Sequence, residues 1–107
     1  MGVIEQARAL AAELGRSQEL QTLKLAERQV MDNQNAFNML NKYMEMENSL
    51  MLKQMQGQVP ETEIRSLNSY REQISQDQVV ARFFAAKQNF DKLWYQVNQI
   101  LSSVLQT

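Results

Sequence analysis

The sequence predicts an all-α protein of about five helices, in which two long helices (about 32–56 and 77–106) pack as an antiparallel bundle within an oligomer. Three observations lead to this fold class. Apolar residues recur at helical spacing along most of the 107 residues. Only 3 glycines and 1 proline interrupt the pattern, and no stretch alternates as a half-buried strand does. The length predicts a single domain spanning residues 1–107.

The first two predicted helices are short. The first runs from about Val3 to Leu14, and Gly15 is expected to end it, because glycine is favoured just after a helix. Ser17 then offers its hydroxyl as the N-cap of a second helix. The break is short, so one element kinked at Gly15 is the alternative, and separate helices are the preferred interpretation.

The long central helix is expected to begin at an Asp32 cap and to end at Gly57, where glycine adopts a left-handed conformation at little cost. Five of the 7 methionines lie in this segment. Its apolar residues cover roughly half of the circumference, wider than the stripe of about 100° that faces a single core. A second layer, from this chain or from another copy, is therefore expected to cover the excess.

The last helix carries the most regular pattern of the chain. Pro60 is placed at the first turn of a fourth helix that ends near Gln76, and Asp77 is expected to cap the last helix. Two rows with seven-residue spacing follow: Phe83, Phe90, Val97 and Val104, and Val79, Ala86, Leu93 and Ile100. The central and last helices are therefore expected to build the core of the protein as antiparallel neighbours.

The surplus apolar arc of the central helix predicts where copies of the chain meet. Five residues of the arc are expected to cover the last helix of the same chain: Phe37, Leu40, Met44, Met51 and Met55. Tyr43, Met46 and Leu50 are then the predicted interface residues of a homodimer or homotetramer. Glu47 and Gln54 lie in the same arc and are candidates for fixing the register of the assembly.

Composition removes most catalytic chemistry. The chain has 0 histidines and 0 cysteines, so it lacks imidazole acid-base catalysis, thiol nucleophiles and the usual zinc, haem and iron-sulfur ligands. The serines have no candidate base, and 3 glycines are too few for a phosphate-binding loop. The sequence therefore predicts no catalytic, cofactor-binding or metal-binding residues, no cofactor and no enzyme.

Charge and hydropathy limit the classes of partner that the protein can bind. The 11 basic and 12 acidic residues are mixed along the chain, and the net charge is -1. No basic field is present to bind a phosphate backbone, so direct nucleic-acid binding is disfavoured. No apolar run reaches the length of a membrane span, and the N-terminal residues do not form a signal peptide, so a cytoplasmic protein without a membrane partner is expected.

Two stretches carry a family pattern: the Gln-Met-Gln-Gly sequence of Gln54–Gly57, and the run from Asp77 through Phe90 to Asn98. Together with the apolar positions of the earlier helices, they resemble the YlbF/YmcA family, nearest to its YheA-type (UPF0342-like) members. The resemblance spans nearly the whole chain. It implies an all-helical cytoplasmic protein that forms dimers or tetramers.

The resemblance also implies a function. Better-known members of the family are non-enzymatic regulators of competence, sporulation and biofilm formation, in a complex linked to RNase Y and messenger RNA processing. Their cysteine-bearing tail, implicated in iron-sulfur binding, has no counterpart here, because the chain has 0 cysteines. The predicted function is therefore a regulatory or scaffolding protein that acts through protein-protein contacts. A nucleic-acid-binding accessory protein is the alternative, and a small enzyme or cofactor carrier comes last.

Overall fold

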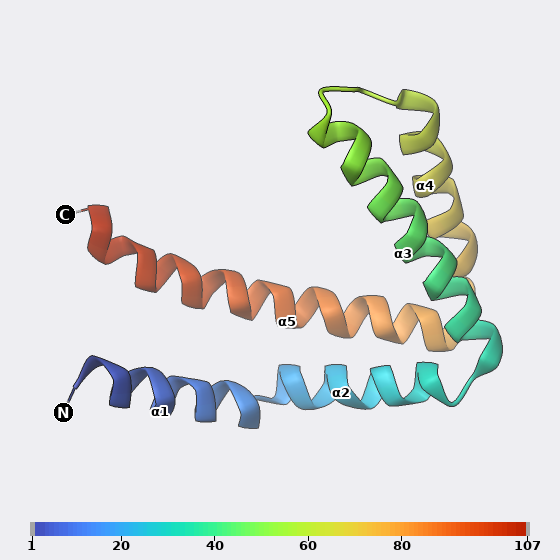
Figure 1. Ribbon diagram of the computed structural model, residues 1–107. Helices are drawn as coiled ribbons and strands as arrows, with labels where there is room; N and C mark the ends of the chain where they lie inside the picture. The colour runs from blue at the N-terminus through green and yellow to red at the C-terminus, as the bar shows by residue number, and fades with distance from the viewer. Residues whose placement is uncertain (1, 107) are drawn as a thin grey trace. The chain divides into compact units, whose positions relative to one another are not determined.

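The computed structural model describes residues 2–106, and all of its regular structure is helical (Figure 1). Its elements are α1 (Val3–Arg16), α2 (Gln18–Met31), α3 (Gln34–Met55), α4 (Glu61–Ile74), α5 (Gln78–Ser102) and the 3-10 helix η1 (Ser103–Gln106). The predicted all-α fold with five helices is confirmed. No helix within the described residues is long and apolar enough to cross a bilayer.

The described chain divides into two compact units. The terminal unit comprises the residues up to Arg28 and those from Phe83 onward, and the central unit comprises Gln29–Arg82. Whether these two units form the single domain expected over residues 1–107 stays a prediction. Residues 1 and 107 lie outside the described part of the chain. The expected pairing of the two long helices is not confirmed, because most of α5 belongs to the terminal unit and α3 to the central unit.

In the terminal unit, α1 and α2 are separate helices, as preferred from the sequence, but the break lies at Ser17 and not at Gly15. Gly15 remains helical. Helix α1 ends two residues later than Gly15 would suggest, because the Ser17 hydroxyl donates a 2.7 Å hydrogen bond to the carbonyl oxygen of Leu14. The same hydroxyl oxygen accepts a 3.2 Å hydrogen bond from the backbone N–H of Leu20, which confirms Ser17 as the N-cap of α2.

The core of the terminal unit lies between α2 and α5, which run alongside each other in Figure 1. Leu23, Ala26 and Ala86 are buried there, and three larger side chains pack against them: Leu20, Phe83 and Phe90. The heptad rows of the last helix are thus confirmed over their first turns. Further along α5, Phe90 stacks on Trp94 with ring centroids 6.4 Å apart.

In the central unit, α3 begins one residue later than expected. Asn33, and not Asp32, is the N-cap, and its side-chain oxygen accepts a 3.0 Å hydrogen bond from the N–H of Ala36. Asn and Asp cap helices about equally well, so residue type alone does not choose between Asp32 and Asn33. The N–H of Asn33 also donates a 3.1 Å hydrogen bond to the carbonyl oxygen of Val30, near the end of α2.

The turn after α3 has the predicted left-handed glycine. Gly57 has φ +83°, and the two N–H groups after the C-cap bond back to the helix. The N–H of Gly57 donates to the carbonyl oxygen of Gln54, and that of Gln58 donates to Lys53, which is the Schellman pattern. α4 follows with Pro60 as its N-cap and ends at Ile74, two residues before the expected end.

The central unit buries side chains from all of its helical segments. Ala36, Leu40 and Tyr43 of α3 are buried, and so are Ile74 of α4 and Val80 at the start of α5. The Asp77 carboxylate accepts hydrogen bonds from the N–H groups of Val79 (2.9 Å) and Val80 (3.1 Å), which confirms its predicted role as the α5 cap.

Candidate functional site

Helix α4 covers one side of the apolar arc of α3. Three contacts between the helices hold it there. The Tyr70 hydroxyl donates a 3.4 Å hydrogen bond to the carbonyl oxygen of Met39, the Lys42 ammonium lies 4.7 Å from the centroid of the Tyr70 ring, and Lys53 pairs with Glu63. These contacts fix which part of α3 faces α4 and which part does not.

The predicted interface residues lie on the side of α3 that α4 covers. Tyr43 is 7% exposed, and Met46 and Leu50 are half-buried within the chain. Their role as contacts between copies stays a prediction. Burial raises the pKa of the Tyr43 hydroxyl, and the negative charge of Glu47 adds to this effect, whereas the charge and hydrogen bond of Arg71 lower it. Tyr43 is therefore neutral at physiological pH and belongs to a polar group shared by α3 and α4.

The other side of the arc is exposed. At about 100° per residue, Phe37, Met44, Met51 and Met55 fall within an arc of about 40°. Their exposed fractions are 39%, 49%, 51% and 76%, respectively. We call these four residues the methionine surface. Their expected packing on the last helix of the same chain stays a prediction, and only Leu40 of that expected set is buried.

The methionine surface has the chemistry of a protein-binding surface. Methionine side chains are unbranched and polarisable, so they adapt to different apolar partners at little cost. Its flank on α3 includes the exposed polar residues Asn48 and Glu47, so an apolar stripe is bordered by polar groups. A contiguous apolar surface with a polar border marks an interaction site more often than isolated exposed apolar residues do.

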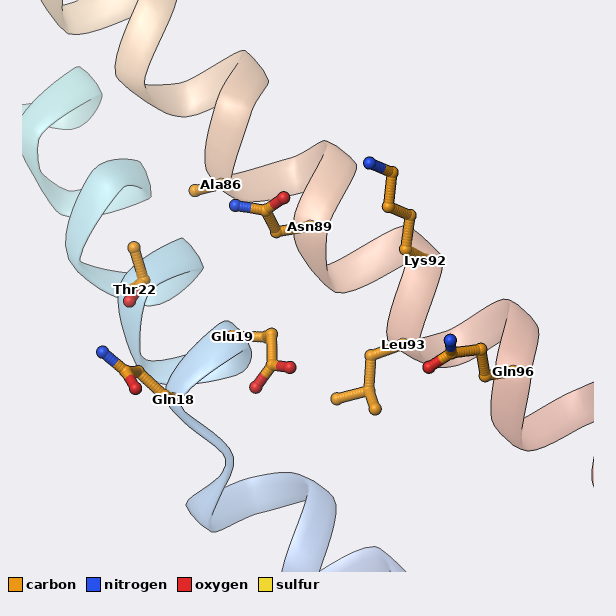
Figure 2. Close-up of a pocket in the computed structure, with 8 residues that line it drawn as sticks. All are labelled: Gln18, Glu19, Thr22, Ala86, Asn89, Lys92, Leu93 and Gln96. Carbon is orange, nitrogen blue, oxygen red and sulfur yellow. The ribbon is translucent and has the colours of Figure 1, made fainter.

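A cleft of about 570 Å³ lies in the terminal unit between α2 and α5. Figure 2 shows its eight lining residues: Gln18, Glu19, Thr22, Ala86, Asn89, Lys92, Leu93 and Gln96. Figure 2 shows the Glu19 carboxylate on the side of α2 that faces α5. Amides, one carboxylate and one ammonium can hold a polar group, but the Thr22 hydroxyl has no imidazole or thiol partner in a chain with 0 histidines and 0 cysteines.

The sequence did not predict this cleft. Its α2 residues are more than 60 positions away from its α5 residues in the sequence. No motif in either helix indicates that the two groups of residues lie together. No group of three or more acidic side chains within residues 2–106 is placed to hold a metal ion. The cleft is thus a polar depression between two helices.

Comparison with known protein families identifies the family of this chain. The chain matches the family described as "Control of competence regulator ComK, YlbF/YmcA" over residues 3–106. The chain belongs to the YlbF/YmcA family. The match covers every helix of the structure, so the resemblance predicted from Gln54–Gly57 and from the run through Phe90 is confirmed. The description links this family to the regulation of competence.

Two staphylococcal proteins are similar to this YlbF/YmcA chain. UPF0342 protein SSP0954 of Staphylococcus saprophyticus is 28% identical over 102 residues, which are 94% of this chain and 90% of the relative. UPF0342 protein SH1117 of Staphylococcus haemolyticus is 26% identical over the same shares of both chains. No solved structure matches the chain. The nearness to UPF0342-like members, expected from the sequence, is thereby confirmed.

Proposed function

We propose that this YlbF/YmcA protein is a non-enzymatic regulatory or scaffolding protein of the cytoplasm that acts through protein-protein contacts. It works as a homodimer or homotetramer, in a regulatory complex of the kind that controls competence, sporulation, biofilm formation or RNase Y-linked messenger RNA processing. The family description, which names a competence regulator, supports the regulatory class. The lack of cysteine fits a reducing compartment.

The exposed methionine surface is the observation that carries this function. Met44 and Met51 each expose about half of their side chain on a helix that is otherwise well packed against α4. Folding leaves this apolar area in water, so a partner that covers it gains the free energy of burial. An adaptor needs such a surface, whereas an enzyme needs a reaction centre that the cleft does not supply.

A pull-down from the native cytoplasm tests the function. We expect the wild-type chain to retain a defined set of proteins after RNase treatment, and the Met44→Glu/Met51→Glu variant to lose them. The matched control is Asn68→Glu/Ser69→Glu, which adds the same charge at two exposed positions of α4 outside the methionine surface. Recovery of RNA alone, with binding that weakens steeply as salt rises, would replace this function by that of a nucleic-acid-binding accessory protein.

Light scattering tests the predicted self-contacts separately. If Tyr43, Met46 and Leu50 join copies, Met46→Glu/Leu50→Glu should lower the mass and leave helical circular dichroism largely unchanged. Loss of helicity in this variant would place both residues in the core that α3 shares with α4. Their half-buried positions in a single chain make this comparison necessary.

A further inference from the structure

The methionines of α3 fall into two groups on different sides of the helix. Met39 and Met46 are half-buried on the side that α4 covers, and Met46 lines a depression shared with α4. Met44, Met51 and Met55 belong to the methionine surface, which lies about 120–180° around the helix from the other two. One helix therefore carries the same side chain in a covered and in an open environment.

Exposure determines which thioether groups a dissolved oxidant can reach. Met44, Met51 and Met55 are 49%, 51% and 76% exposed, respectively. A sulfur atom covered by α4 is reached only when the two helices separate locally, which costs free energy. The chain has 0 cysteines, so no thiolate competes for the oxidant. The three exposed thioethers are thus the open sulfur groups of α3.

Oxidation of these side chains would change the chemistry of the whole methionine surface. Methionine sulfoxide is polar, and its formation disrupts surfaces that rely on methionine for apolar contact. The three sulfur atoms belong to one stripe about 40° wide, in which Phe37 is the only other member. Three sulfoxides would therefore leave Phe37 as the last apolar side chain of a surface that had four.

We propose that Met44, Met51 and Met55 form a modification site, at which hydrogen peroxide or an organic hydroperoxide oxidises them to sulfoxides and blocks protein binding to the methionine surface. The inference rests on the proposed function in one respect, which is that this surface binds a protein. A partner that covers the surface would bury the sulfoxide oxygens. Each oxygen buried without a hydrogen-bond donor lowers the affinity by about tenfold.

The reaction transfers one oxygen atom to each sulfur. A lone pair of the thioether sulfur attacks one peroxide oxygen, the O–O bond breaks and an S–O bond forms. The leaving hydroxide takes the proton from the transferred OH group and becomes water, and an organic hydroperoxide gives an alcohol in the same way. The sulfur loses two electrons and the peroxide gains them. A thiol-dependent sulfoxide reductase reverses the change, with the oxygen released as water and two thiols joined as a disulfide.

Peptide mass spectrometry tests the site without any partner. During treatment with hydrogen peroxide, we expect Met44, Met51 and Met55 to gain one oxygen atom several times faster than Met39 and Met46. Fragment ions distinguish the methionines that share a peptide. In denaturant the five rates should become equal, because the helices no longer cover any sulfur atom. Equal rates in the folded protein would overturn the modification site.

A pull-down with oxidised protein tests the effect on binding. The wild-type chain is treated with peroxide, desalted and offered to the cytoplasm without added thiol, and retention of its partners should fall by about tenfold or more. In Met44→Leu/Met51→Leu/Met55→Leu the stripe stays apolar and has no sulfur, so peroxide should not reduce its binding. Loss of binding by this treated variant would overturn the assignment to the three methionines.

Met31→Leu is the matched control, because Met31 is 73% exposed but lies at the end of α2, outside the methionine surface. This variant should stay as sensitive to peroxide as the wild type. Protection of binding by Met31→Leu alone would place the sensitive sulfur outside α3 and overturn the inference.

Glutamine substitutions imitate the sulfoxides without an oxidant. In Met44→Gln/Met51→Gln/Met55→Gln an amide group occupies each position, and partner retention should fall without peroxide while helical circular dichroism stays unchanged. Equal retention by untreated and fully oxidised wild type would end this inference and leave the adaptor function intact. An untreated chain that retains no protein after RNase treatment would instead end the adaptor function, and with it the proposed effect of oxidation on binding.

Discussion

The hydroxyl of Ser17 lies 2.7 Å from the carbonyl oxygen of Leu14, and this contact ends α1. The same oxygen accepts the N–H of Leu20 and starts α2. One side chain therefore separates two helices of 14 residues each. Without this hydroxyl, the chain would lose both side-chain hydrogen bonds at the break between α1 and α2.

Ser17→Ala should lower stability. Loss of an N-cap hydroxyl costs about 1 kcal/mol, which corresponds to a midpoint about 4–8 °C lower for a chain of about this size. Thermal unfolding followed by circular dichroism measures it. Ser69→Ala, at an exposed position inside α4, is the matched control and should leave the midpoint unchanged or slightly higher, because alanine favours helices. Equal midpoints for wild type and Ser17→Ala would show that the hydroxyl is not needed at the break.

Gly57→Val should destabilise the chain through the backbone alone. A Cβ at this position meets nothing within 4 Å, but φ is +83°. A β-branched residue is strained there by about 1 kcal/mol or more. Chemical unfolding should therefore give a lower midpoint with an unchanged slope. Gly57→Asn should cost less, since asparagine tolerates the left-handed region, and the reverse order would contradict the observed turn.

Gly15→Ala should have the opposite effect. Gly15 lies inside α1 without a positive φ, and a Cβ there also meets nothing within 4 Å. Alanine in a helix interior is more stable than glycine by about 0.5–1 kcal/mol. The unfolding midpoint should rise. A fall would mean that Gly15 ends the helix, as the sequence first predicted.

Tyr43 should make stability sensitive to high pH. Its burial raises the pKa above the ordinary value of 10.0, and Glu47 adds to the shift. The folded chain therefore holds the proton more tightly than the unfolded chain. The associated stability is complete below about pH 10 and is lost as the pH rises through the raised pKa. The free energy of unfolding of wild type relative to Tyr43→Phe should fall over this range and stay constant from about pH 7 to 9. A parallel course of both proteins above pH 10 would contradict the burial of this hydroxyl.

The purified protein should contain no stoichiometric transition metal. Within residues 2–106 no three acidic side chains converge, and the sequence has 0 histidines and 0 cysteines to add softer ligands. Elemental analysis after dialysis measures the metal content. One equivalent of zinc or iron per chain would contradict this prediction and reopen the cofactor-carrier interpretation.

Local structure was predictable because its causes lie within a few residues of each other. The caps at Ser17 and Asp77 and the glycine at 57 each depend on bonds that span two to five positions. The error at Asp32 has the same origin, since Asn33 is an equally good cap beside it. Gly15 was misplaced because glycine near a break suggests a helix end even when a serine two residues later supplies the bond.

The arrangement of surfaces was less predictable. The apolar arc of α3 is wide enough to pack in either direction, and no local rule decides whether α4 covers Met46 or Met44. That choice follows from tertiary contacts such as Tyr70 with Met39. The regular heptads of the last helix likewise predict an apolar face, but not that Ile100 and Val104 remain exposed in a single chain. A periodic pattern identifies a face and leaves its partner undetermined.

The stretch from Leu93 to Gln106 has no charged side chain, which determines how association of copies along it should respond to the solvent. An interface of this composition has no ion pairs for salt to screen, so added sodium chloride should change its affinity little. Its driving force is the burial of apolar area, which weakens on cooling. Copies that associate along this stretch should therefore dissociate more readily at low temperature. A mass measured after cold storage would then underestimate the assembly that forms at higher temperature.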